Sequence, residues 1–196
     1  SEDLDMAIDS FATAIEAIQS LDKGILLGLA NLGLAEAMVE VDVQVSEDED
    51  FDTAYYHCDQ ALTVLKDTED VELFASSQLA AGKIMFNRYR FDVDKVEDLD
   101  KAILYFEKAK KAFDEDSPEA ANQVLGLCLV HLAEVMCERR ESDFHHQVES
   151  ALSNVVNAHR MLHRDSWPKE WAEAHISMAT CYLLRHKGKP WRNVED

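Results

Sequence analysis

Residues that interrupt helices are scarce in this sequence. Only 6 glycines and 3 prolines occur among its 196 residues, whereas a fold made of short strands and many turns needs more of both. Hydrophobic residues make up 47% of the chain and charged residues 30%. The chain therefore has enough apolar side chains to form a core, which is not typical of a disordered protein. The composition predicts an all-α protein.

Basic residues are also few. The sequence has 19 Lys and Arg against 39 Asp and Glu, which gives a formal net charge of −20. Such a chain repels the phosphates of nucleic acids and the headgroups of anionic membranes. We therefore expect a protein or peptide as the partner, with a basic surface favoured, and we expect neither nucleic acid nor membrane.

Paired cysteines and long hydrophobic runs are missing as well. None of the four cysteines forms a Cys-x-x-Cys pair, so we interpret them as reduced, mostly buried thiols, as in a cytoplasmic protein, with a nuclear location also open. The most apolar run, residues 24–35, is shorter than the roughly 20 residues that span a bilayer. The opening residues do not have the basic and apolar regions of a secretion signal.

One pattern of apolar residues occurs four times along the chain. Its positions 0, 3, 4, 7, 10 and 14 lie on one side of an α-helix, and its copies begin at Leu4, Phe51, Leu99 and Val148. We call these four segments the template helices. Positions 3 and 10, counted from 0, hold alanine in every copy. We expect packing between repeats at Ala7, Phe11, Ala14, Ala54, Cys58, Ala61, Ala102, Phe106, Ala109, Ala151, Val155 and Ala158.

The template helices resemble the second helix of a tetratricopeptide repeat (TPR), where small residues let neighbouring helices approach closely. The intervening segments resemble its first helix at Leu32-Gly33, Ala81-Gly82, Leu125-Gly126 and Met178-Ala179. The copies are spaced 47, 48 and 49 residues apart, longer than the usual repeat of about 34. In this they are similar to the long-repeat arrays found beside caspase-like (CHAT) protease domains.

The resemblance implies a right-handed α-solenoid of about four antiparallel helix pairs, with repeats of about 48 residues. We expect one TPR-like helical repeat domain over residues 1–196, as a fragment of a longer array. The first template helix has no intervening helix before it, and residues 193–196 resemble the start of a fifth template helix. Uncapped ends of this kind predict self-association.

No pattern in the sequence indicates catalysis. It contains no glycine-rich phosphate loop, nucleophile elbow or HExxH motif, so we expect no enzyme and no cofactor. His159 and His163 stand four residues apart on one predicted helix and could share a metal. Because no third ligand follows at a suitable spacing, we predict that no metal is held tightly.

A binding scaffold is the function that the resemblance implies, with the intervening helices lining its concave groove. The hypotheses are an adaptor that binds a peptide or helix of another protein, an acidic chaperone for a basic client such as a histone or ribosomal protein, a regulatory repeat region of a larger protease-containing protein, or a spacer between domains. The residues expected to contact a partner are Ala30, Leu34, Ala120, Gln123, Leu127, Ile176 and Thr180.

Overall fold

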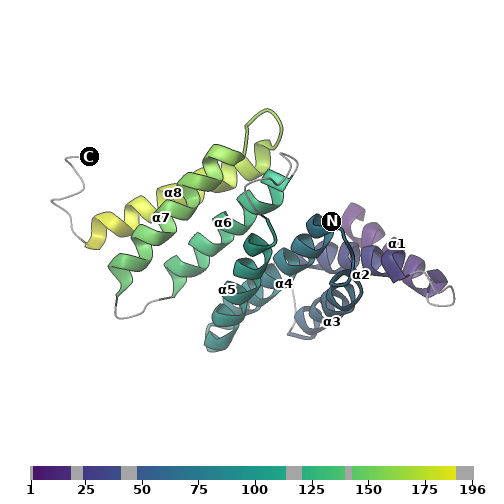
Figure 1. The fold of residues 1–196 in the computed structure, drawn as a ribbon. Helices are drawn as coiled ribbons and strands as arrows, with labels where there is room; N and C mark the ends of the chain where they lie inside the picture. The colour runs from purple at the N-terminus through teal and green to yellow at the C-terminus, as the bar shows by residue number, and fades with distance from the viewer. Residues whose placement is uncertain (1, 19–23, 41–47, 114–120, 140–142, 189–196) are drawn as a thin grey trace. The chain divides into compact units, whose positions relative to one another are not determined.

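Helices are the regular elements of the chain. The computed structural model describes residues 2–18, 24–40, 48–113, 121–139 and 143–188, and no strand occurs within these ranges. The all-helical fold predicted from the sequence is therefore confirmed. The helices, shown in Figure 1, are α1 (Glu2–Ile18), α2 (Gly24–Val39), α3 (Asp48–Leu65), α4 (Val71–Phe91), α5 (Val96–Lys111), α6 (Asn122–Glu138), α7 (Phe144–Met161) and α8 (Pro168–Gly188).

Template and intervening helices alternate along the chain. The four template segments form α1, α3, α5 and α7, and the intervening segments form α2, α4, α6 and α8. Acidic side chains cap two of these helices: Asp70 accepts a hydrogen bond from the backbone N–H of Leu73, and Asp143 accepts one from that of His146. These bonds satisfy N–H groups that have no partner within the helix.

The contacts divide the chain into two compact units, Ser1–Ala112 and Phe113–Asp196. In unit 1 each helix from α1 to α5 packs against the next one, and α2 also packs against α4. In unit 2, α7 packs against α6 and α8, and α6 packs against α8. Template helix α3 thus lies between α2 and α4, and template helix α7 lies between α6 and α8. Whether residues 1–196 behave as one domain stays a prediction.

Glycines in the intervening helices make room for large residues of the template helices. A Cβ atom added at Gly82 of α4 would lie 2.3 Å from Cε1 of Phe106 in α5, and one added at Gly33 of α2 would lie 2.4 Å from Cζ of Phe11 in α1. Real Cβ atoms do not approach a ring so closely, and Phe106 is fully buried. These aromatic rings therefore rest directly on the backbone of the neighbouring helix.

Changing Gly82 to alanine is expected to lower the free energy of unfolding by about 1–3 kcal/mol, because the added methyl group overpacks the contact with Phe106. This loss should outweigh the roughly 1 kcal/mol that alanine gains over glycine in a helix. Gly24→Ala is the matched control, since its nearest neighbour would be 3.7 Å away. Urea denaturation measures both variants, and an unchanged midpoint for Gly82→Ala would contradict the contact.

Arg88 joins three helices of unit 1 through two ion pairs, one with a buried and one with an exposed aspartate. Asp98 of α5 is 1% exposed and accepts two hydrogen bonds from Arg88 of α4, at 2.7 Å from Nε and 2.9 Å from Nη2. Nη1 of Arg88 also donates to Asp52 of α3 at 2.7 Å, and Lys101 lies 3.2 Å from Asp98. Two parallel bonds to one carboxylate are the strong arrangement for arginine. Arg88 therefore holds α3, α4 and α5 in register.

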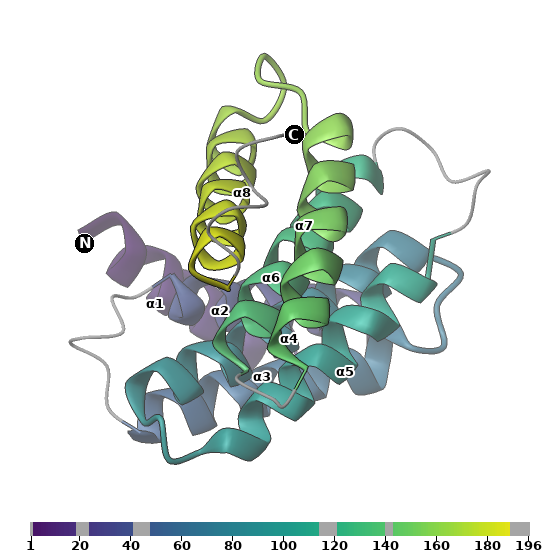
Figure 2. The ribbon, with the colours of Figure 1, turned by 90° about the vertical axis from the view of Figure 1, so that its left-hand side faces the viewer.

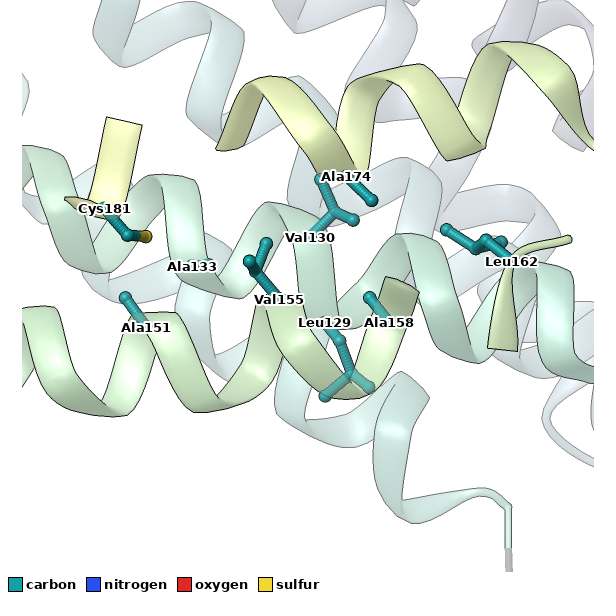
Figure 3. Packing of buried hydrophobic residues seen from close by; sticks show 9 residues of the cluster. All are labelled: Leu129, Val130, Ala133, Ala151, Val155, Ala158, Leu162, Ala174 and Cys181. Atoms are coloured by element: carbon teal, nitrogen blue, oxygen red, sulfur yellow. The ribbon is translucent and has the colours of Figure 1, made fainter. Parts of the chain in front are cut away.

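The core of unit 2 is formed by residues from all three of its helices. Figure 3 shows side chains of the three helices meeting in one cluster, with Val130 of α6 next to Ala174 of α8. Figures 1 and 2 both show α7 running alongside α8. The cluster consists of Leu129, Val130 and Ala133 of α6, Ala151, Val155 and Ala158 of α7, Leu162 after α7, and Ala174 and Cys181 of α8.

Candidate interaction surface

Helices α6 and α8 of unit 2 lie side by side and form one surface. From one contact between them to the next, the residue numbers rise together in both helices, so the two helices run parallel. Their contacts are Gln123 Nε2 to Glu170 Oε1 at 2.8 Å, Ser177 Oγ to Glu134 Oε1 at 2.8 Å, and Cys137 Sγ to Cys181 Sγ at 3.7 Å.

Four residues expected to bind a partner are on these two helices. Gln123 and Leu127 of α6 are half-buried, and Ile176 and Thr180 of α8 are exposed. The polar groups beside them are mostly acidic. His131 Nδ1 lies 3.0 Å from Oε2 of Glu134, whose other oxygen accepts the bond from Ser177. We call the surface made by Gln123, Leu127, His131, Glu134, Glu138, Glu173 and Thr180 the α6–α8 face.

The other expected binding residues lie elsewhere. Ala30 and Leu34 of α2 are buried in a cluster with Ile15 of α1, so these two residues belong to the core rather than to a binding surface. Helix α2 is apolar around most of its circumference, so its sequence did not show which side would face α1. Ala120 lies outside the described residues.

Charged residues mark the exposed side of α2 that the apolar pattern missed. Glu36 and Glu40 stand four residues apart on this helix, and both are exposed. Nζ of Lys83 in α4 lies 2.8 Å from Oε1 of Glu40. Although Glu36 is exposed by surface area, the atoms packed around its carboxyl reduce its hydration and raise its pKa, and the positive charge of Lys83 partly offsets this increase. Two glutamates at this spacing in an otherwise apolar helix were the available signal.

The residues expected to pack between repeats are distributed unevenly. In α1 they are only partly buried, and α1 packs extensively against α2 alone among the described helices. In the other three template helices they are buried, as each of these residues shows: Ala54, Cys58, Ala61, Ala102, Phe106, Ala109, Ala151, Val155 and Ala158. Ala7, Phe11 and Ala14 are the corresponding residues of α1.

His159 lies in an aromatic cluster that joins α7 to α8. Its ring centroid is 4.5 Å from that of His175 and 6.1 Å from that of Trp171, whereas His163 is exposed. The guanidinium of Arg164 lies 5.6 Å from the centre of the Trp171 ring. The spacing of Trp171 and His175, four residues apart on α8, was the signal for this cluster. Within the described ranges, no three His, Cys, Asp or Glu residues are grouped to hold a metal.

All four cysteines are free thiols, and Cys58, Cys128 and Cys181 are buried. Burial raises the pKa of Cys58 and of Cys128 to about 12 in each case. These two thiols therefore stay protonated at neutral pH and act as small apolar residues of the core. No helix in the described part of the chain is long and apolar enough to cross a lipid bilayer.

Comparison with known proteins identifies the fold class. No family model matches the chain, and no curated protein sequence matches it. The crystal structure of a de novo designed helical repeat protein matches 98% of this chain and 94% of its own, with 15% sequence identity and a TM-score of 0.53. The chain thus has a helical repeat fold, and the predicted class of α-solenoid built from helix pairs is confirmed. At this identity the likeness concerns the fold alone.

Proposed function

We propose that the protein is a non-catalytic scaffold that binds a peptide or helix of a partner protein. The observation that carries the proposal is the α6–α8 face, where the half-buried Leu127 and the exposed Thr180 lie among carboxylates. The resemblance of the template helices to tetratricopeptide repeats supports a binding role, as does the helical repeat fold, which commonly mediates protein interactions.

The chemistry of this face favours a basic partner with apolar residues. Glu134, Glu138 and Glu173 are on its two helices, and the whole chain has a net charge of −20. Such a field attracts lysine and arginine side chains and speeds their association. Leu127 offers a half-buried apolar contact on this face. An amphipathic helix that carries both kinds of residue suits this surface.

The acidic chaperone is the second candidate, and the same net charge favours it. The two functions differ in how binding responds to salt. Contacts between exposed charges are screened beyond a Debye length of about 8 Å at physiological ionic strength, whereas burial of apolar residues is not. A scaffold should retain much of its affinity at high salt, and a chaperone for basic clients should lose most of its affinity.

Replacing Thr180 with lysine tests the scaffold proposal. A displayed library of helical peptides is selected against the wild-type protein, and the affinity of the selected basic, amphipathic peptides is measured by calorimetry. Thr180→Lys should weaken binding by about tenfold, equivalent to about 1.4 kcal/mol, because it places a positive charge on the α6–α8 face. Asn157→Lys is the matched control, since it adds the same charge at an exposed position of α7.

Equal affinities for the two lysine variants would show that the peptides bind elsewhere and would contradict the proposed face. Selection of acidic or uncharged peptides would contradict the proposed partner chemistry. Binding that disappears at high salt would favour the acidic chaperone over the scaffold.

A further inference from the structure

Intervening helices have small residues at two positions that lie seven residues apart. A Cβ atom added at Gly28 would lie 3.0 Å from Cγ of Leu65, and one added at Gly126 would lie 2.7 Å from Cγ of Leu162. Leu65 and Leu162 occupy the last position of the template pattern in the helix that follows. The following template helix therefore packs against these small residues, and we call the surface that they form the seat. They are Gly28 and Ala35 in α2, Ala75 and Gly82 in α4, and Gly126 and Ala133 in α6, and all six are buried.

Helix α8 has the same pair of small residues, but both are exposed. Ala172 and Ala179 are seven residues apart, and each comes 46 residues after its counterpart in α6. The large apolar residues on the same side of α8 are also uncovered, with Ile176 67% exposed and Leu183 65% exposed. The opposite side of α8 packs through Ala174 and the buried Cys181 in the core of unit 2. Among the described residues, no template helix covers this seat on α8.

Helix α1 is a template helix whose apolar side is only partly covered. Its alanines Ala7 and Ala14 are only partly buried, whereas Ala54 and Ala61 of α3 are buried because α3 packs between α2 and α4. No intervening helix precedes α1 among the described residues. Among the described residues, one side of the apolar stripe of α1 therefore lacks the contact with a preceding intervening helix that the other template helices make.

The ion pairs of the chain indicate which charges would meet if α1 occupied the seat on α8. In α4, Arg88 binds Asp52, which follows the first template position of α3, and Asp98, which precedes the first template position of α5. Arg185 follows Ala179 by six residues, as Arg88 follows Gly82. Nε of Arg185 lies 2.8 Å from Oε1 of Glu149, which follows the first template position of α7. The two arginines thus have the same relation to the preceding template helix.

Helix α1 carries an acid at the position that would face Arg185. Asp3 precedes the first template position of α1, as Asp98 does in α5. Helix α1 has five acidic residues and no basic ones, and three of the acids, Glu2, Asp3 and Asp5, are in its first turn. If α1 docked as the other template helices do, that turn would lie near the C-terminal end of α8, where Arg185 is found. The charges of the two helices are therefore complementary.

We propose that α8 of one copy binds α1 of a second copy, which packs on the side of α8 that the described residues leave exposed. Residues Ala172, Ala179, Ile176 and Leu183 form the seat, and Asp3 of the second copy pairs with Arg185. This contact is heterologous, because it joins two different surfaces, so copies associate head to tail. The proposal does not depend on the α6–α8 face, since Thr180 and Leu127 are not part of the seat.

Directed cross-linking tests this pairing. Chains carrying Ala172→Cys are mixed with chains of different mass carrying Ile18→Cys, because Ile18 has the template position of Leu65 and Leu162. Cysteines in that register are close enough for a disulfide, which forms when a copper–phenanthroline complex takes up two electrons from the thiols and the two protons pass to the solvent. We expect a mixed dimer of the two chains. Asn157→Cys, exposed on α7, replaces Ala172→Cys in the control, and we expect no mixed dimer from it.

Light scattering over a concentration series provides the second measurement. The mass of the wild-type protein should rise with concentration, and Ala179→Glu should weaken the association by about tenfold or more. Because Ala179 is exposed, this variant should retain the helical content and melting temperature of the wild type.

Three outcomes would overturn the proposal. The first is a wild-type protein that stays monomeric at the highest concentration, whether or not another protein binds to α8. The second is cross-linking of Ala172→Cys chains to each other as efficiently as to Ile18→Cys chains, which would indicate pairing of two α8 helices. The third is association that is unchanged in Ala179→Glu.

Discussion

Replacing Asp98 with alanine is expected to lower the free energy of unfolding of unit 1 by about 3–5 kcal/mol. Asp98 is almost completely buried and receives two hydrogen bonds from Arg88 and a contact from Lys101. Its removal leaves the half of the Arg88 guanidinium that faces α5 without its carboxylate. Removal of the buried partner of an ion pair is among the few causes of such large losses. Urea denaturation followed by circular dichroism measures the effect.

Asp52→Ala is the matched control, because Asp52 binds the same arginine at the same distance of 2.7 Å. The Asp52 side chain is 69% exposed, so water can replace it. We expect a loss of about 1 kcal/mol or less for this variant. Similar losses for Asp52→Ala and Asp98→Ala would show that burial does not determine the strength of these pairs, contrary to the structure.

The same ion pair predicts how stability depends on pH. Burial by itself raises the pKa of Asp98, but hydrogen bonds from Arg88 and Lys101 outweigh burial and hold the pKa below its usual value. The contribution of Asp98 is therefore complete above the unfolded pKa of about 3.9 and is lost as the pH falls through the lower folded pKa. Urea midpoints measured during acidification should fall less steeply for Asp98→Ala than for the wild type.

Replacing Phe106 with alanine is expected to cost about 3–5 kcal/mol of unfolding free energy. Its ring is fully buried and rests on the backbone of Gly82, where no Cβ atom separates the two helices. Truncation leaves a cavity between α4 and α5, which the rigid helices cannot fill by small movements. Thermal and urea denaturation should both show the loss.

Leu104→Ala is the control for this prediction, because Leu104 is on the same helix and is 53% exposed. We expect its effect to stay within about 0.5 kcal/mol. A second check uses coupling between neighbours: Gly82→Ala should cost less in the Phe106→Ala background, since the ring that it overpacks is gone. Additive losses for the two changes would mean that Gly82 and Phe106 do not form the contact described here.

The candidate binding surface could be predicted only in part. Repeat phase predicts Gln123, Leu127 and Thr180, which are part of the α6–α8 face, and also Ile176, which is exposed on the neighbouring side of α8. Ala30 and Leu34 were assigned by the same reasoning and are buried in the core. An amphipathic helix shows its buried face in its sequence, but a helix that is apolar all round does not.

The sequence by itself determined the helices and their repeat. The four copies of the template pattern, each with alanine at the same two positions, were enough to predict an all-helical repeat fold, because residue spacing along a helix sets which side chains share a face. Only the tertiary structure decided which apolar faces are covered. Ala133 of α6 and Ala179 of α8 are each the second of two small residues seven apart in an intervening helix, yet Ala133 is buried and Ala179 is exposed. Burial depends on which helix packs against a face, and the residue pattern within one helix does not specify that partner.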